Sequence, residues 1–212
     1  MGVIAHMRSR TTMELFQYWN AVRGDRDLPR RDEIDPAHIR SLLPDLFILQ
    51  RQTNGGIGFR LAGTRVCALF GRELRDRQFA DLWLASDADG IARTADQVMT
   101  QLTPVLLYAS GAAESGEELD VELLLAPLAS PDGTNDRLLG ALSALSHPAW
   151  LHMTPLMRLV ATGLSLPDAS RNSPLDRSYE ISTGAKVGVA GGRGRDNRRV
   201  PHLRILEGGK SG

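Results

Sequence analysis

The segment from Glu118 to Leu125 constrains the fold most, because acidic and apolar side chains alternate along it. Its apolar set is Leu119, Val121, Leu123 and Leu125, and its polar set is Glu118, Asp120 and Glu122. A period of two residues indicates a β-strand with one buried face. The chain must therefore contain a sheet that covers a hydrophobic core.

Other segments supply partners for this strand. The predicted strands are 45–52, 57–62, 105–110 and 137–145. Asn54-Gly55-Gly56 tolerates the positive φ angles of a tight turn, so it predicts a hairpin between the first two. Short helices are expected between Gly63 and Trp83, and a longer helix is expected to end before Pro104. Hairpin-length connections favour an α+β fold with an antiparallel sheet.

An amphipathic helix is predicted from Thr11, where Thr11 and Glu14 fit a capping box, and it ends near Gly24. Its apolar side chains recur at helical spacing. They are Leu15, Phe16, Trp19 and Val22. Such a stripe packs on its own domain or on the equivalent helix of a second copy, and we assign it as a candidate dimer helix.

The length of 212 residues accommodates one domain with extensions. We predict a flexible N-terminus at 1–10, a domain at 11–147 and a C-terminal extension at 148–212. Within the extension, 156–166 favours extended structure, while 168–201 is rich in Ser, Gly, Asn, Asp and Arg and is expected to be flexible.

Charge and composition exclude several classes of protein. The 25 Lys and Arg residues balance 25 Asp and Glu residues, so nucleic acid is not an expected partner. A lone cysteine, Cys67, cannot form an internal disulfide and fits a reducing compartment. No apolar run reaches the roughly 20 residues that span a bilayer, so no membrane association is expected. We therefore predict a cytoplasmic protein.

The balance of charge is uneven along the chain. Residues 1–150 hold 15 basic and 20 acidic side chains, whereas residues 151–212 hold 10 basic and 5 acidic ones. The predicted domain is thus acidic and the tail basic, which leaves the tail able to bind its own domain or an acidic partner.

The central residues resemble a known family. Its signature is matched by Phe59-Arg60-Leu61-Ala62-Gly63-Thr64-Arg65-Val66-Cys67, by Phe70-Gly71-Arg72-Glu73-Leu74 and by Asp81-Leu82-Trp83. With weaker matches from 13 to 209, these runs resemble a family of single-PAS-domain proteins common in alphaproteobacteria. The resemblance implies a PAS-like five-stranded antiparallel sheet with flanking helices, which enclose a cavity. It also implies a sensory or interaction module that has no output domain of its own.

The resemblance directs attention to residues that could line such a cavity. The candidate ligand-cavity residues are Phe47, Arg60, Leu61, Cys67, Phe70, Trp83, Met99 and Leu124. Three of them have an alternative structural role weighed beside this one, since Trp83 and Phe70 can fill a core and Arg60 can pair with an acid. We expect no cofactor, although an unknown small ligand would be compatible with such a cavity.

Chemical motifs are sparse. Cys67 precedes Gly71-Arg72, whereas light-sensing PAS relatives carry their reactive cysteine after a Gly-Arg-Asn motif, so it is expected to pack as a small hydrophobe. His147 and His152 give only a weak metal signal, and no metal is predicted. The basic cluster at 193–199 lacks an aromatic residue to stack on a base.

Together these patterns predict a non-catalytic PAS-type regulatory module that binds a regulatory protein as a homodimer. A flavin- or haem-binding sensor is the alternative, although the predicted long helix contains no histidine to ligate haem. An enzyme built on the cavity ranks lowest, because no acid, base or nucleophile stands out.

Overall fold

The computed structural model describes residues 7–53, 55–130, 133–151, 153–167 and 177–179. Its strands form one antiparallel sheet with the order β2-β1-β5-β4-β3-β6-β7. The strands are β1 (Leu46–Arg51), β2 (Ile57–Ala62), β3 (Val105–Ala113), β4 (Glu118–Leu128), β5 (Arg137–Ala144), β6 (Leu156–Leu166) and the short β7 (Arg177–Tyr179). The hairpin and the three later strands predicted from the sequence are confirmed.

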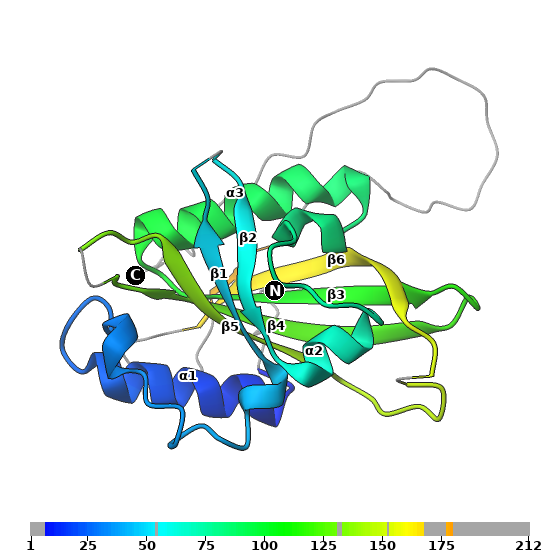
Figure 1. Ribbon diagram of the computed structural model, residues 1–212, viewed down its shortest axis with the longest axis horizontal. Helices are drawn as coiled ribbons and strands as arrows, with labels where there is room; N and C mark the ends of the chain where they lie inside the picture. The colour runs from blue at the N-terminus through cyan, green and yellow to red at the C-terminus, as the bar shows by residue number, and fades with distance from the viewer. Residues whose placement is uncertain (1–6, 54, 131–132, 152, 168–176, 180–212) are drawn as a thin grey trace, which may run out of the picture.

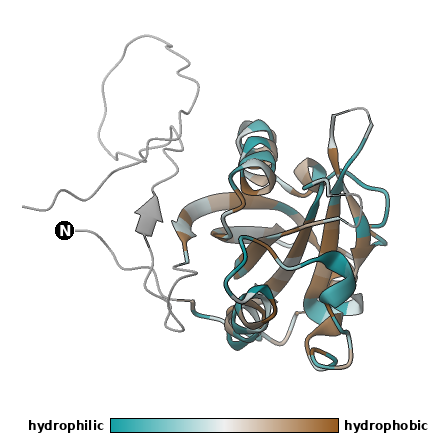
Figure 2. Ribbon diagram, turned by 90° about the vertical axis from the view of Figure 1, so that its left-hand side faces the viewer, coloured by the Kyte–Doolittle hydropathy of each residue, from teal (hydrophilic) through white to brown (hydrophobic). Residues whose placement is uncertain are grey.

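Helices lie on both faces of this sheet (Figure 1). The α-helices are α1 (Arg10–Arg23), α2 (Thr64–Leu69) and α3 (Ala85–Gln101), and the 3-10 helices are η1 (Arg31–Glu33), η2 (Leu43–Asp45) and η3 (Phe79–Leu82). We call the sheet face toward α2, η3 and α3 the inner face, and the face toward α1 the outer face. Apolar residues concentrate on the strands between the helices, whose outward surfaces are polar (Figure 2).

The prediction of a five-stranded sheet was wrong, because β6 extends the sheet beyond β3. It pairs with β3 from Ala113–Leu156 to Leu106–Ser165, and its Leu156, Leu159 and Leu164 join the core of the inner face. Without it, β3 would present an unpaired edge, which folded proteins generally cover. The first part of the predicted C-terminal extension therefore belongs to the sheet.

The domain also begins earlier than residue 11. Ser9 caps α1 by accepting a hydrogen bond from the Thr11 amide, so Thr11 lies inside the helix. Met7 is buried and joins the core of the outer face. Glu14 pairs with Arg10 one helical turn earlier and does not complete the predicted capping box.

The predicted flexible segment 168–201 lies outside the described residues, apart from the three residues of β7. The basic cluster at 193–199 lies outside them as well. Within the described part of the chain, no helix has the length and apolar character needed to cross a membrane.

Candidate functional site

The inner face carries an aromatic cluster, which we define as Phe47, Phe59, Phe79 and Trp83. Its ring centroids lie 5.6 Å apart for Phe47 and Phe59, 6.2 Å for Phe47 and Phe79, and 5.9 Å for Phe79 and Trp83. None of the four side chains is more than 2% exposed. The rings come from β1, β2 and η3 and from the residue after η3, so they fill the space between these elements.

A glycine on β5 makes room for this cluster. Gly140 pairs with Phe47 across β1 and β5, and a Cβ atom there would lie 2.2 Å from the phenyl ring. The phenyl ring therefore occupies the space that a side chain at 140 would need. This close approach fixes where the cluster lies along the sheet.

One polar atom of the cluster stands out. The Nε1 atom of Trp83 is buried and donates a hydrogen bond to no acceptor among the described residues. Buried N–H groups in native proteins almost always have a partner. The indole N–H can therefore donate to a small acceptor, such as a carbonyl or hydroxyl oxygen of a ligand, in an otherwise apolar interior.

Cys67 lies at the margin of the same core, on α2. Burial raises the pKa of its thiol, and the nearby Glu73 carboxylate, with Oε2 at 3.7 Å from Sγ, acts in the same direction. A raised pKa lowers the fraction of thiolate, which is the nucleophilic form. The position suits the packing role that the sequence indicated.

The outer face is built differently, because a buried carboxylate holds α1 there. Glu122 on β4 is fully buried and accepts hydrogen bonds from the backbone amides of Arg8, at 2.7 Å, and Ser9, at 3.0 Å. The Thr12 hydroxyl donates to the same carboxylate. These bonds join the start of α1 to the middle of the sheet. The N-terminal end of a helix dipole is positive and therefore also favours an acidic side chain at this position.

A second bond holds α1 farther along. The indole Nε1 of Trp19 donates to the carbonyl oxygen of Pro127 on β4, at 2.9 Å. Leu15 and Phe16 are buried beside it in the outer core. The helix is thus fixed by polar bonds at two points and by an apolar stripe between them.

Comparison with known proteins agrees with this architecture. A family model described as PAS domain matches residues 7–143. The chain belongs to the PAS domain family. The match covers both faces of the sheet up to β5 and includes the start of α1, so the domain is a sensory module of PAS type.

Two solved structures are similar to this PAS domain at low sequence identity. One is the PAS domain of a protein from Colwellia psychrerythraea, with 14% identity and a TM-score of 0.39, which covers 52% of this chain and 97% of that one. Another is a structure of RsLOV with a single substitution, with 16% identity and a TM-score of 0.39, which covers 55% of this chain and 70% of that one. No curated protein matches the chain.

The PAS fold brings together five of the eight predicted ligand-cavity residues. They are Phe47, Cys67, Phe70, Trp83 and Met99, all buried in the inner core. Phe47 and Trp83 belong to the aromatic cluster. These five side chains belong to one hydrophobic core of packed side chains.

The other three predicted residues lie elsewhere. Leu124 is buried on the outer face, in the core under α1, and Leu61 is 51% exposed. The β1–β2 register shifts between Ile48, which pairs with Leu61, and Leu49, which pairs with Phe59. Arg60 is therefore the extra residue of a bulge and is paired in register with no residue of β1. Arg60 is exposed and donates to the Gln50 side chain at 3.0 Å. A bulge of this kind turns consecutive residues to one side, which simple alternation does not predict.

The residues assigned to a dimer helix serve the domain itself. Leu15, Phe16 and Trp19 are buried against the sheet, and Val22 is partly buried beside them. The alternative that the stripe packs on its own domain therefore describes the observed helix. The same residues could reach a second copy only after α1 leaves the sheet.

Glu122 is the important residue that was not among the predicted site residues. We grouped it with the polar, exposed face of its strand, yet it is 0% exposed. A signal was present two residues later, because Leu124, Ala126 and Leu128 continue the same face as apolar residues. The face therefore becomes covered near Glu122.

A separate hollow of about 300 Å³ opens between the start of α1, α2 and β5. None of the eight predicted ligand-cavity residues lines it, but His147 does. In the described part of the chain, no group of three or more His, Cys, Asp or Glu side chains could hold a metal ion. His152, the predicted neighbour of His147, lies outside the described residues.

Proposed function

We propose that this PAS domain protein is a non-catalytic regulatory module of the cytoplasm, which forms a homodimer and binds a regulatory protein. The observation that carries the proposal is the packed interior of the PAS domain, where the aromatic cluster occupies the space beside the inner face. The regulatory protein is then recognised by the surface of the domain and not by its interior. The lone Cys67 supports a reducing compartment, and the signature residues support a place among the single-PAS proteins of alphaproteobacteria.

The surface best suited to a partner lies around β6. Met157 and Val160 on β6 are 48% and 37% exposed, and Met153, just before the strand, is 80% exposed. Leu84 is 45% exposed and donates its amide to the Leu159 carbonyl, which places it beside the same strand. Exposed apolar groups that gather in this way are typical of protein interaction sites.

Homodimerisation is tested by native mass spectrometry of the full chain. We expect a dimer for the wild type and a monomer for Met157→Glu, because a carboxylate in an apolar contact loses hydration. Arg93→Glu changes an exposed residue on α3 and serves as the control that should remain dimeric. A wild-type protein that is strictly monomeric, carries no ligand and retains no partner would contradict the proposal.

Partner binding is tested by affinity capture from the source cells with the same three proteins. The proposal expects a protein that is retained by the wild type and by Arg93→Glu but is lost with Met157→Glu. If all three proteins retain the same set, the β6 surface is not the binding site.

A small interior ligand is a second candidate, because Trp83 Nε1 has no acceptor in the part of the chain that the structure describes. Such a ligand would present an acceptor oxygen to the indole and apolar groups to Phe47 and Phe79. Native mass spectrometry should then find a bound mass that Trp83→Phe loses. An absorption spectrum of the purified protein separates this candidate from flavin or haem, both of which absorb visible light.

A further inference from the structure

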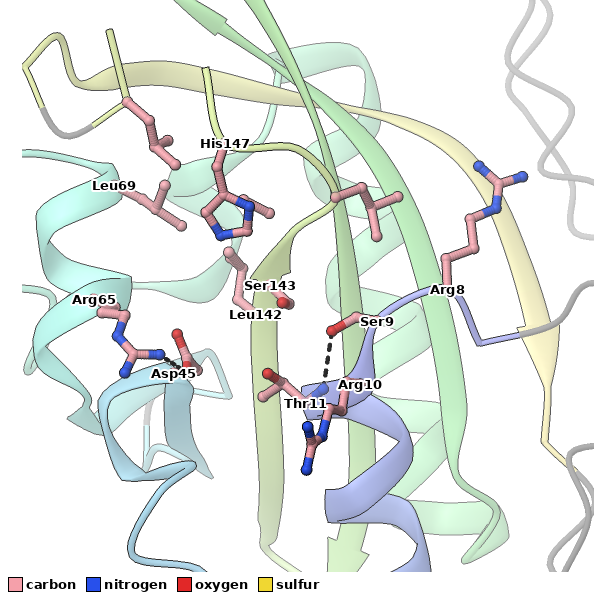
Figure 3. A pocket seen from close by; sticks show the side chains of 13 residues that line it. Arg8, Ser9, Arg10, Thr11, Asp45, Arg65, Leu69, Leu142, Ser143 and His147 are labelled. Atoms are coloured by element: carbon pink, nitrogen blue, oxygen red, sulfur yellow. Dashed lines mark hydrogen bonds and ion pairs between the residues drawn. The ribbon is translucent and has the colours of Figure 1, made fainter. Parts of the chain in front are cut away.

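The hollow at the start of α1 gathers side chains from four parts of the chain (Figure 3). Ser9, Arg10 and Thr11 come from α1 and its cap, Asp45 comes from η2, and Arg65 comes from α2. β5 and the residues that follow it close the remaining side. The floor is apolar and belongs in part to the inner core, and it consists of Leu69, Leu142, Leu145 and Leu151.

Basic side chains stand around this floor. The imidazole of His147 points into the space between α2 and β5, with Arg65 on one side and Arg10 on the other (Figure 3). Arg8 also lines the hollow, but its guanidinium points away from His147 (Figure 3) and lies over the ring of Tyr108, 5.3 Å from its centroid. The hollow thus has three arginines and a histidine along its lining.

Carboxylates balance only part of this charge. Among the described residues of the lining, Asp45 is the single acidic one, and it accepts from Arg65 Nη1 at 2.5 Å. Arg10 Nε donates to Glu14, which lies outside the lining, at 2.5 Å. A guanidinium carries five N–H donors in a fork, so one such bond leaves donors that can face a ligand.

Hydroxyl groups complete the polar side of the hollow. Thr11 and Ser143 are half-buried in its lining, and Ser9 is 7% exposed. The Ser9 hydroxyl oxygen accepts from the Thr11 amide at 3.1 Å. Hydroxyls and guanidinium groups over an apolar floor match a molecule with an anionic head and an apolar body.

We propose that this hollow binds a small organic anion, a carboxylate or a phosphate monoester with an apolar body. The anionic head lies between Arg10, Arg65 and His147, and the apolar body rests on Leu69 and Leu142. The ligand touches both α1 and α2, and its binding therefore stabilises the docked position of α1. The site is separate from the interior beside Trp83 and from the β6 surface, so its fate does not depend on the proposed function.

The test uses the full chain and four probes, namely benzoate, phenyl phosphate, inorganic phosphate and the neutral benzamide. Two-dimensional amide NMR follows each titration. We expect saturable shifts at Ser9, Thr11 and Ser143 with benzoate or phenyl phosphate, and none with benzamide. Whichever aromatic anion binds more tightly identifies the head group, and inorganic phosphate alone measures what the apolar body contributes.

Variants assign the binding to the hollow. Arg65→Gln and His147→Ala should each weaken binding about tenfold, since each removes a donor to the anion. Ser143→Leu fills the hollow and should abolish saturation, while Arg93→Gln on α3 should bind like the wild type. His147 is exposed, so its variant keeps the test valid if Arg65→Gln impairs folding by removing the ion pair with Asp45.

Three results would overturn the proposal. It fails if neither aromatic anion saturates, if benzamide produces the same shifts, or if binding survives unchanged in His147→Ala and Ser143→Leu. Heating provides an independent readout, because a ligand that binds only the folded state raises the unfolding temperature.

Discussion

The two faces of the sheet are both buried, yet they are closed by different means. On the inner face, rings from β1, β2 and η3 pack against one another, and the one polar atom of that cluster, Trp83 Nε1, has no acceptor among the described residues. On the outer face, α1 and the segment that follows it cover the strands. The start of α1 donates hydrogen bonds to Glu122, and Trp19 donates one to the Pro127 carbonyl.

The difference teaches how each layer is positioned. The position of the inner layer is set by shape complementarity. Gly140 leaves room for Phe47, and a side-chain atom at position 140 would overlap the phenyl ring. Directional bonds set the outer layer, because a helix on an apolar surface could otherwise slide or rotate by small amounts. Each face has a buried tryptophan. The N–H of Trp19 has an acceptor, whereas that of Trp83 has none among the described residues, which makes the comparison measurable.

The largest effect should come from Trp19→Ala, which empties the centre of the outer layer. We expect a loss of about 3–5 kcal/mol in the free energy of unfolding, as for other large-to-small changes in cores. Urea unfolding monitored by circular dichroism measures it. Phe47→Ala on the inner face is the matched variant and should lose a similar amount. A loss below about 1 kcal/mol for Trp19→Ala would mean that α1 adds little to the core.

Glu122→Ala tests the polar half of the outer layer. It leaves the amides of Arg8 and Ser9 and the hydroxyl of Thr12 without their acceptor, so we expect a loss of roughly 3 kcal/mol. Glu122→Gln keeps one acceptor oxygen and should lose less. Hydrogen exchange should show faster opening in α1 than in β4. Equal exchange in both elements would argue against a local anchor.

The same substitution at both tryptophans sharpens the comparison further. Trp19→Phe breaks a satisfied bond to Pro127, whereas Trp83→Phe removes an N–H that has no acceptor among the described residues. Both changes remove the same atoms, so we expect Trp19→Phe to be more destabilising by about 1 kcal/mol. Chemical denaturation of the two variants measures the difference. An inner-face variant that is equally destabilised would reveal an acceptor for Trp83, which is what a bound ligand would supply.

The smallest effect concerns alkaline pH. Burial raises the pKa of the Cys67 thiol above its ordinary value of 9.0, so the folded chain holds that proton more tightly than the unfolded chain. The stability this contributes is complete below pH 9.0 and is lost as pH rises through the pKa of the folded state. Cys67→Ala should therefore lose less stability than the wild type between neutral and strongly alkaline pH. Parallel pH profiles for the two proteins would contradict this.

Local pattern was enough to predict most of the strands and the two long helices. The alternation around Val121 and the turn at Gly55 each depend on residues that are adjacent in the sequence, so the sequence alone is enough to predict them. The signature from Phe59 to Trp83 also predicted the family, which the match over residues 7–143 confirms. The resemblance to the narrower alphaproteobacterial group stays a prediction.

The candidate site was predicted less completely, since it depends on which face each residue occupies. The bulge in β2 shifts Arg60 out of the regular pairing with β1. Leu124 lies on the face opposite to Phe47, because successive side chains of a strand point to opposite faces and its neighbours Leu123 and Leu125 occupy the inner face. Glu122 looked like a solvent-exposed carboxylate until the start of α1 covered it. No local signal couples residues so far apart in the chain.

By itself the sequence determined an α+β chain with an antiparallel sheet, a helix with an apolar stripe, and the family to which these belong. Only the tertiary structure decided that α1 docks on its own sheet, that β6 extends that sheet, and that Arg65 and His147 border one hollow. The physical reason is that propensity and periodicity act over a few residues, whereas burial, buried hydrogen bonds and cavities arise between segments that meet only on folding.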